Sequence, residues 1–408
     1  MKNVEAYARL LLEKGVALNP EQDLIVNAPI EAYALVEAIN HLAYREFSSG
    51  TVHINWQAAK FSRHKFLYGI DKALEDVPEY NITRYKLALH RKAAVLNITS
   101  SFPKLMEDVN PERVKKATQL TSQKIRPYEQ KIYTDLKWCV AAYPNEDWAE
   151  KVFPGVQIDD ALENLSNAMH HGLRLDEDDP SKAWDDHLKA LKRRAEKLNE
   201  MQFESLRFSS KETSFTTTLP EHHVWRHASR TTPEGETHIP NFPAEKIATA
   251  PYKFGASGTL KITRETHVRG TKIEPFTLTF KDGKVTQIKG KNPHVLQQLL
   301  GVDEGSAYMG EIALVSNQSP LASLNTKFFH TLFDENAASH IALGNAAPRS
   351  IEGGEKLNRQ GLEEKGLNQS RMHFKLMIDA PDMRVEGITE KGEAVPIMEA
   401  GQFDKAFS

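Results

Sequence analysis

Residues 24–54, LIVNAPIEAYALVEAINHLAYREFSSGTVHI, contain the alternation that decides the fold of the first half of the chain. The apolar runs at the two ends of this stretch, 24–26 and 52–54, have the length of buried strands. Between them, apolar residues recur at helical spacing, at Leu35, Val36, Ile39, Leu42 and Ala43. A strand, a helix and a second strand in this order predict a βαβ unit.

The same alternation continues along the first half. Apolar runs at 94–98 and 138–143 are further strand candidates, and a helix is expected between them, beginning at Asn110-Pro111-Glu112. An asparagine can cap the free amides of a helix, and proline suits its first turn. No glycine-rich phosphate loop, either Gly-x-Gly-x-x-Gly or Gly-Lys-Ser/Thr, follows these strands, so we do not expect a nucleotide-binding domain.

A long helix that begins at Asp179-Pro180 is expected to end this first half. After it the chain is rich in strand formers, with a hairpin turned by Asp282-Gly283 and a short helix capped by Asn292-Pro293. We therefore predict an α/β protein of two domains. Residues 1–200 would form an N-terminal alternating α/β domain that ends in the long bridging helix, and residues 201–408 a mixed α+β domain.

The composition is that of an ordinary globular protein. With 408 residues, of which 40% are hydrophobic and 26% charged, the chain can bury a large core. A formal net charge of -3 provides no basic field, so we expect neither nucleic acid nor a membrane as a partner. No uncharged apolar run is long enough to span a membrane, and no signal peptide is visible. The single Cys139 excludes an internal disulfide, and these features together predict a cytoplasmic protein.

Acidic residues and histidines gather in the last third of the chain. Glu311 follows Gly310, Glu335 and His340 lie five residues apart, and His373 comes further on. Carboxylates and imidazoles are ligands for divalent metals such as zinc. Because an isolated histidine more often forms a hydrogen bond than it binds a metal, the pattern by itself leaves both interpretations open.

Motifs along almost the whole chain resemble those of the thermophilic aminopeptidase family, which includes aminopeptidase T, aminopeptidase S and PepS. In the second half they include IPNFPAE (239–245), GEIAL (310–314), TLFDENAASH (331–340) and IEGG (351–354). In the first half they include AYP (142–144), KVFP (151–154) and LRLD (173–176). Agreement at this many separate places makes the resemblance specific.

The resemblance implies a homodimeric metallo-aminopeptidase that releases N-terminal residues from peptides with two divalent ions per chain, which would be zinc, cobalt or manganese. By position, Glu311, Glu335, His340 and His373 resemble metal ligands of the family, so the resemblance makes residues 201–408 the catalytic domain with the metal site. Glu245 resembles an acid that either holds an ion or acts as the catalytic general base, and the sequence leaves these two roles open.

Three positions depart from the family pattern. Lys246 stands where the family has a second acid, and Lys375 stands where it has an aspartate ligand two residues after the histidine. Ala347 stands in place of a tyrosine whose hydroxyl could stabilise an oxyanion. An ammonium group has no lone pair to donate. The lysines therefore either neutralise the carboxylates in place of metal ions, or Lys375 turns to solvent and leaves a weaker site for one ion, held by the four predicted ligands.

Two functions follow from these observations. The chain is either a metal-dependent aminopeptidase that its substituted ligand set impairs, or a catalytically silent, aminopeptidase-like dimer that serves as a binding or structural protein. The resemblance to the family favours the first function, and the three substitutions favour the second.

Overall fold

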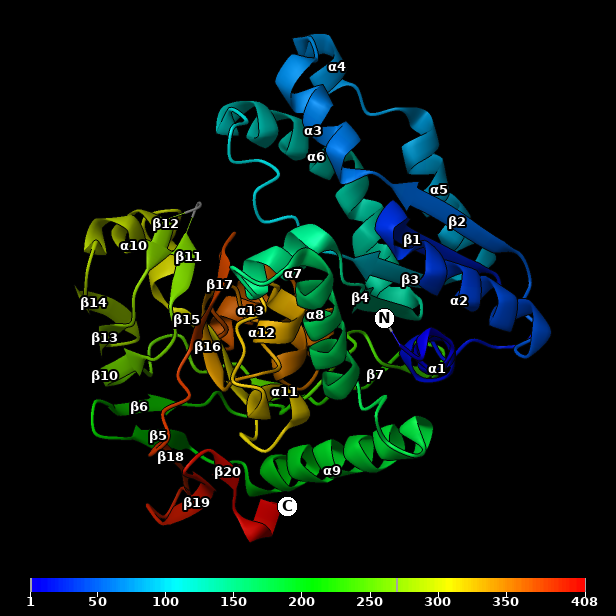
Figure 1. Cartoon of the computed structure of the whole chain (residues 1–408). Coiled ribbons are helices and arrows are strands. Elements are labelled where there is room, and N and C mark those ends of the chain that lie inside the picture. Colours follow the sequence, from blue (N-terminus) through cyan, green and yellow to red (C-terminus); the bar gives the residue numbers. More distant parts are fainter. Residues whose placement is uncertain (1, 269–270, 408) are drawn as a thin grey trace. The chain divides into compact units, whose positions relative to one another are not determined.

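The computed structural model of the chain describes residues 2–268 and 271–407 (Figure 1). The chain forms two compact units, each described separately below. The first consists of Met1–Asp185, Ser229–Ala244 and Thr326–Asp334, and the second of Asp186–Ala228, Glu245–Asn325 and Glu335–Ser408. The domain boundary expected after residue 200 stays a prediction; in these units, two later segments of the chain join the first.

A four-stranded parallel sheet in the order β2-β1-β3-β4 forms the centre of the first unit. Its strands are β1 (Leu24–Pro29), β2 (Val52–Gln57), β3 (Ala94–Thr99) and β4 (Trp138–Ala142). The connection from β1 to β2 contains α2 (Tyr33–Arg45), which buries the apolar positions named above. The βαβ unit predicted from residues 24–54 is confirmed.

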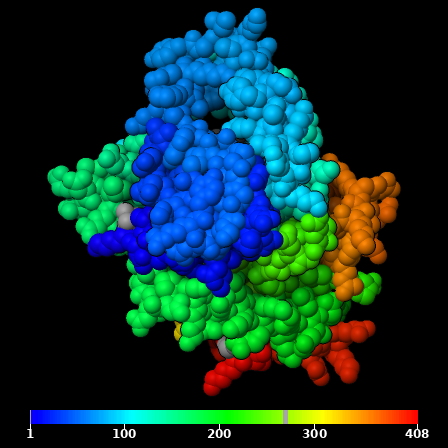
Figure 2. All heavy atoms as spheres, turned by 90° about the vertical axis from the view of Figure 1, so that its right-hand side faces the viewer, coloured from blue at the N-terminus to red at the C-terminus, as the bar shows by residue number. Residues whose placement is uncertain are grey.

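The other helices of the first unit are α1 (Val4–Leu10), α3 (Ala59–Tyr68), α4 (Asp71–Glu75), α5 (Glu79–Arg91), α6 (Pro111–Asp135), α7 (Glu146–Val152), α8 (Ile158–Gly172) and α12 (Thr331–Asp334). Ala88 of α5 and Ile132 of α6 share a buried cluster with Ile25 of β1. Asn110 accepts a hydrogen bond of 2.9 Å from the amide of Glu112, which confirms the predicted cap of α6. In Figure 2 the first part of the chain, coloured blue, forms one continuous surface of this unit.

The predicted long helix is α9 (Pro180–Met201). Residues 180–185 of this helix belong to the first unit and residues 186–201 to the second. The first unit contains a two-stranded sheet of β7 (Arg230–Thr231) and β8 (Thr237–His238). Cys139 of β4 is fully buried, and burial raises the pKa of its thiol.

An eight-stranded antiparallel sheet in the order β14-β13-β10-β6-β5-β18-β19-β20 forms one layer of the second unit. Its strands are β5 (Ser205–Ser209), β6 (Ser214–Thr218), β10 (Ser257–Ile262), β13 (Phe276–Lys281), β14 (Lys284–Lys289), β18 (Arg384–Ile388), β19 (Ala394–Glu399) and β20 (Gln402–Phe403). The predicted hairpin joins β13 to β14 through Asp282 and Gly283, both of which have positive φ as a type I′ turn requires.

Smaller elements complete the second unit: α10 (Pro293–Leu300), α11 (Pro320–Ser323), α13 (Arg359–Glu364), β11 (Thr266–Val268) and β12 (Thr271–Ile273). The predicted helix after Asn292 is therefore present as α10. The capping role predicted for Asn292 is wrong, because its backbone is left-handed and its side chain makes no capping hydrogen bond.

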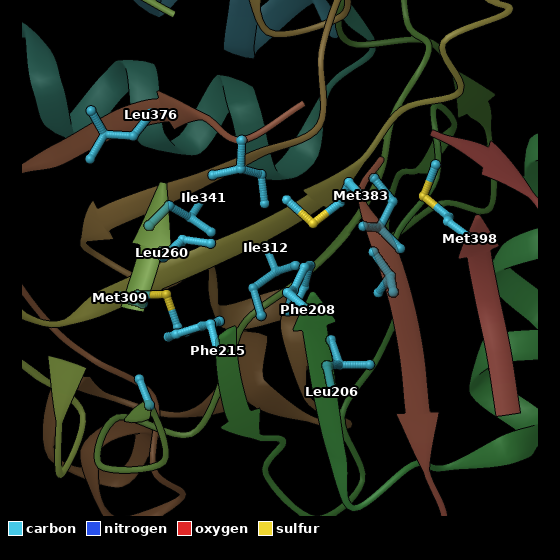
Figure 3. Close-up of a cluster of buried hydrophobic side chains, with 14 of the residues drawn as sticks. Leu206, Phe208, Phe215, Leu260, Met309, Ile312, Ile341, Leu376, Met383 and Met398 are labelled. Atoms are coloured by element: carbon cyan, nitrogen blue, oxygen red, sulfur yellow. The ribbon is translucent and has the colours of Figure 1, made fainter. Parts of the chain in front are cut away.

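A second antiparallel sheet of this unit, in the order β17-β16-β15-β9, positions the site. Its strands are β9 (Ile247–Thr249), β15 (Met309–Leu314), β16 (His340–Gly344) and β17 (His373–Met377). Side chains alternate between the two faces of a strand. On one face, Ile312, Ile341 and Leu376 join a buried cluster with Leu206 and Phe215 of the eight-stranded sheet (Figure 3). The opposite face is free to carry polar residues.

The α/β fold class is confirmed, with a parallel sheet in the first unit and antiparallel sheets in the second. Within residues 2–268 and 271–407, no helix combines the length and the apolar character that crossing a bilayer demands.

Candidate functional site

On the polar face of the β17-β16-β15-β9 sheet, a glutamate, an alanine and a lysine from three neighbouring strands lie in one row of paired residues. Glu311 of β15 is paired with Ala342 of β16, and Ala342 is paired with Lys375 of β17. Side chains of residues in register project from the same face of a sheet. The small side chain of Ala342 therefore leaves room for the longer charged side chains on both sides of it.

A second row lies two residues further along the strands. Ala248 of β9 is paired with Ala313, Ala313 is paired with His340, and an isolated bridge joins Arg226 to Ala248. Ala248 and Ala313 thus lie between Arg226 and His340 in this row. Lys246, two residues before Ala248, extends over the same face.

Three cationic side chains and two carboxylates alternate across this face. Arg226 Nη2 lies 3.1 Å from Glu311 Oε2, and Lys246 Nζ lies 3.2 Å from Glu311 Oε1. The same Nζ lies 3.1 Å from Glu335 Oε2, an oxygen that also contacts Lys375 Nζ. We call Arg226, Glu311, Lys246, Glu335 and Lys375 the ion chain. The carboxylate side chains are 6 and 7% exposed and the cationic ones 18 and 19%, so water screens these charges poorly.

The ion chain shifts the pKa of its members. Burial by itself would raise the pKa of Glu311, but the charge of Lys246, a hydrogen bond with His340 and the charge of Arg226 together hold that pKa well below its usual value. Burial lowers the pKa of Lys375 to about 7, and the neighbouring charge of Lys246 acts in the same direction. The carboxylate of Glu311 is therefore firmly ionised.

His340 is fully buried at the start of β16. Its Nδ1 lies 3.1 Å from the carbonyl oxygen of Ala338, and its Nε2 lies 3.3 Å from Glu311 Oε1. Both partners are hydrogen-bond acceptors, so each contact needs a proton on the ring nitrogen that faces it. Metal-binding histidines are oriented by a hydrogen bond from one ring nitrogen, as Nδ1 is here, but in this site the other ring nitrogen already contacts Glu311.

Glu245, the predicted catalytic residue, is buried next to α9. Its Oε2 lies 3.4 Å from His187 Nε2, and its amide donates a hydrogen bond of 2.8 Å to Asn336 Oδ1. The positive charge of Arg194, also on α9, interacts with this carboxylate. Two basic side chains of α9, those of His187 and Arg194, therefore lie near the carboxylate of Glu245.

His373 lies at the exposed beginning of β17. Its Nδ1 is 2.9 Å from the carbonyl oxygen of Asn345, and in the sheet it is paired with Gly344. His340 is paired with Met377 instead, four residues further along the strand, which corresponds to roughly 13 Å. The structure thus brings Glu311, Glu335 and His340 together and places His373 apart from them, so its role as a ligand stays a prediction.

Ala347 precedes the short turn Pro348–Ser350, and its methyl side chain has no hydroxyl or other hydrogen-bonding group. No oxyanion contact can come from this position.

Arg226 and His187 are among the residues of the site that were not predicted from the sequence. Each is a single basic residue outside any motif, and each reaches the site through pairing or packing with distant segments. No local signal in the sequence marks either of them.

Comparison with known proteins identifies the family. The family described as thermophilic metalloprotease (M29) matches residues 1–403. The chain belongs to this family. Aminopeptidase 2 of Geobacillus stearothermophilus is 35% identical over 404 residues, and aminopeptidase T of Thermus thermophilus is 32% identical over 404 residues; each alignment covers 98% of both chains.

A solved structure agrees with this assignment. The structure of wild-type AmpT from Thermus thermophilus matches with a TM-score of 0.91 and 31% identity, over 98% of this chain and 99% of that chain. The predicted resemblance to thermophilic aminopeptidases is confirmed. By family the chain is a metallo-aminopeptidase, a hydrolase, and membership implies divalent metal ions.

The residues present do not fit two such ions. Both oxygens of Glu311 already face cations, and Glu335 Oε2 faces two ammonium groups. Within the described ranges, no group of three or more histidine, cysteine, aspartate or glutamate residues is placed to hold a metal ion. The carboxylates have the chemistry that a divalent ion requires, but side chains of the protein itself surround them.

Proposed function

We propose that this chain releases N-terminal residues from peptides as a metal-dependent aminopeptidase, and that Lys246, Lys375 and Ala347 impair its hydrolysis. Support for the activity comes from a family match over nearly the whole chain and from relatives named aminopeptidases. Support for the impairment comes from one observation: the ammonium group of Lys246 lies within 3.2 Å of both Glu311 and Glu335.

As part of this proposal, Glu245 is the proton-transfer residue. Its carboxylate is buried and close to His187, which can fix its orientation. General acid/base catalysis by such a group contributes about 10²- to 10⁴-fold to a rate. The predicted metals, zinc, cobalt or manganese, the homodimer and the cytoplasmic location belong to the same proposal.

A second function is favoured by the ion chain. Because both carboxylates of the ion chain are already paired with cationic side chains, the ion chain supports a catalytically silent protein that keeps the aminopeptidase fold and binds peptides. In that case the relatives would share the scaffold of this chain and differ from it in chemistry.

Peptide hydrolysis in the presence and absence of metal tests these functions. The purified full chain would be incubated with a panel of aminoacyl p-nitroanilides and dipeptides, with added cobalt, zinc or manganese and with a chelator. Metal-dependent release that the chelator abolishes would support the aminopeptidase. Absence of release by the wild type, together with release by the double variant Lys246→Glu/Lys375→Asp, would support the silent protein.

A matched control is the variant Lys261→Glu, which changes the same charge at a lysine of the second unit outside the site. Lys261 Nζ lies 2.8 Å from Glu212, whose side chain is 64% exposed. Its hydrolysis should equal that of the wild type. No release by either the wild type or the double variant, with any metal, would contradict the aminopeptidase proposal.

A further inference from the structure

The ammonium nitrogen of Lys246 lies at a point that two buried carboxylates share. Glu311 Oε1 is 3.2 Å from it and Glu335 Oε2 is 3.1 Å from it. These two acids come from separate parts of the chain, one on β15 and the other in the turn before β16. They are therefore held together by a cation between them, which is the structural task of a metal ion that bridges carboxylates.

The surroundings of Lys246 do not resemble a surface salt bridge. Its side chain is 19% exposed, and those of its two partners are 6 and 7% exposed. Two carboxylates buried at this distance from a common point would repel each other strongly without a positive charge between them. A cation at this point allows both carboxylates to stay ionised, whereas without it one of them would take up a proton.

The ends of the ion chain strengthen this arrangement. Arg226 neutralises the far oxygen of Glu311, and Lys375 contacts the same oxygen of Glu335 as Lys246 does. Three cationic side chains thus face two carboxylates, which is a formal surplus of one positive charge. An added divalent ion would increase this surplus and would have to approach within the repulsive field of these groups.

We infer that Lys246 is a tethered cation which occupies the place of a divalent ion between Glu311 and Glu335, and that metal can bind there only by displacing it. This inference deepens the proposed function, since it concerns the same site. In the wild-type chain, Lys246 would thus compete with a metal ion for the same two carboxylates.

Direct metal binding tests the inference without reference to hydrolysis. Cobalt would be titrated calorimetrically into the chelator-treated full chain of the wild type and of Lys246→Gln. Glutamine is neutral, and its amide can still donate hydrogen bonds to both carboxylates. In the wild type, cobalt has to break the charge-assisted hydrogen bonds of Lys246 to Glu311 and Glu335. In Lys246→Gln these charge-assisted bonds are absent, so the affinity of this variant for cobalt should be higher than that of the wild type by roughly tenfold or more. The control Lys261→Gln should bind cobalt as the wild type does.

A second measurement separates competition from loss of folding. The melting temperature of the wild type should be unchanged by chelator, and that of Lys246→Glu/Lys375→Asp should rise when cobalt is added. If Lys246→Gln does not fold without metal, its folding would be followed during the titration, and recovery with cobalt would support the tethered cation.

Three results would overturn the inference. The first is a wild type that binds cobalt as tightly as Lys246→Gln. The second is a wild type that loses thermal stability when chelator is added. The third is a Lys246→Gln chain that is unfolded both with and without cobalt. A hydrolysis assay without product would refute the proposed activity but would leave each of these comparisons unaffected.

Discussion

Replacement of Lys246 by methionine should destabilise the second unit even when no metal is present. Methionine keeps most of the length and apolar surface of the lysine stem but removes the charge. The change removes contacts of 3.2 Å to Glu311 and 3.1 Å to Glu335, both carboxylates being almost fully buried. Loss of one partner of a buried ion pair commonly costs about 3–5 kcal/mol.

The expected loss for Lys246→Met is smaller than that range. Glu311 retains Arg226 and His340, and Glu335 retains Lys375, so neither carboxylate is left without a partner. Desolvation of Lys246 is also relieved. We therefore expect the free energy of unfolding to fall by about 2 kcal/mol. For domains of 150–250 residues this corresponds to a decrease in melting temperature of roughly 4–8 °C.

Differential scanning calorimetry in the presence of chelator would measure this change. The matched control is Lys261→Met, which removes a single contact to the exposed Glu212 and should change stability by less than about 0.5 kcal/mol. A Lys246→Met variant as stable as the control, or more stable than the wild type, would refute the view that Lys246 holds the two carboxylates together.

Three further predictions concern the first unit. Burial lowers the pKa of His330 to about 4, so between pH 6.5 and 4 the unfolded chain binds a proton that the folded chain does not, and the free energy of unfolding should fall by about 2–3 kcal/mol as the pH falls through that interval. The melting temperature of His330→Phe should therefore depend less on pH than that of the wild type. Equal slopes for the two proteins would contradict the lowered pKa. Asn27 donates a hydrogen bond to Asn97 (2.8 Å) and accepts one from Asn55 (3.0 Å). The variant Asn27→Leu should therefore lower the free energy of unfolding, measured by urea titration, by about 1–3 kcal/mol. An unchanged free energy would show that water replaces both bonds. Cys139 is fully buried and its thiol pKa is raised, so a thiol reagent should modify it only after denaturation, and rapid labelling of the native chain would show that β4 is accessible.

The sequence predicted the elements whose signals are local. The strands at 24–26, 52–54 and 94–98, the cap at Asn110 and the Asp282-Gly283 turn depend on residue periodicity and on backbone preferences within a few positions. These were found where they were expected.

The site depends on contacts that no local pattern encodes. Arg226 reaches Glu311 because a bridge to Ala248 places it on the same face of the sheet, in the row next to that of Glu311. The neighbourhood of Lys246 and Lys375 was a hypothesis from the resemblance alone, and its geometry required the pairing of β15, β16 and β17. His373 illustrates the converse, because closeness in sequence to Lys375 did not bring it near His340.

The strict alternation of side chains in the β17-β16-β15-β9 sheet separates two kinds of change. Lys375 is flanked in sequence by Phe374 and Leu376, which belong to the core, yet its own side chain never enters that core. A mutation at 375 or 246 can therefore reverse the charge of the site while the residues that specify the fold stay as they are. We therefore expect substitutions at these two positions to change the metal affinity of the site without changing the residues that form the core.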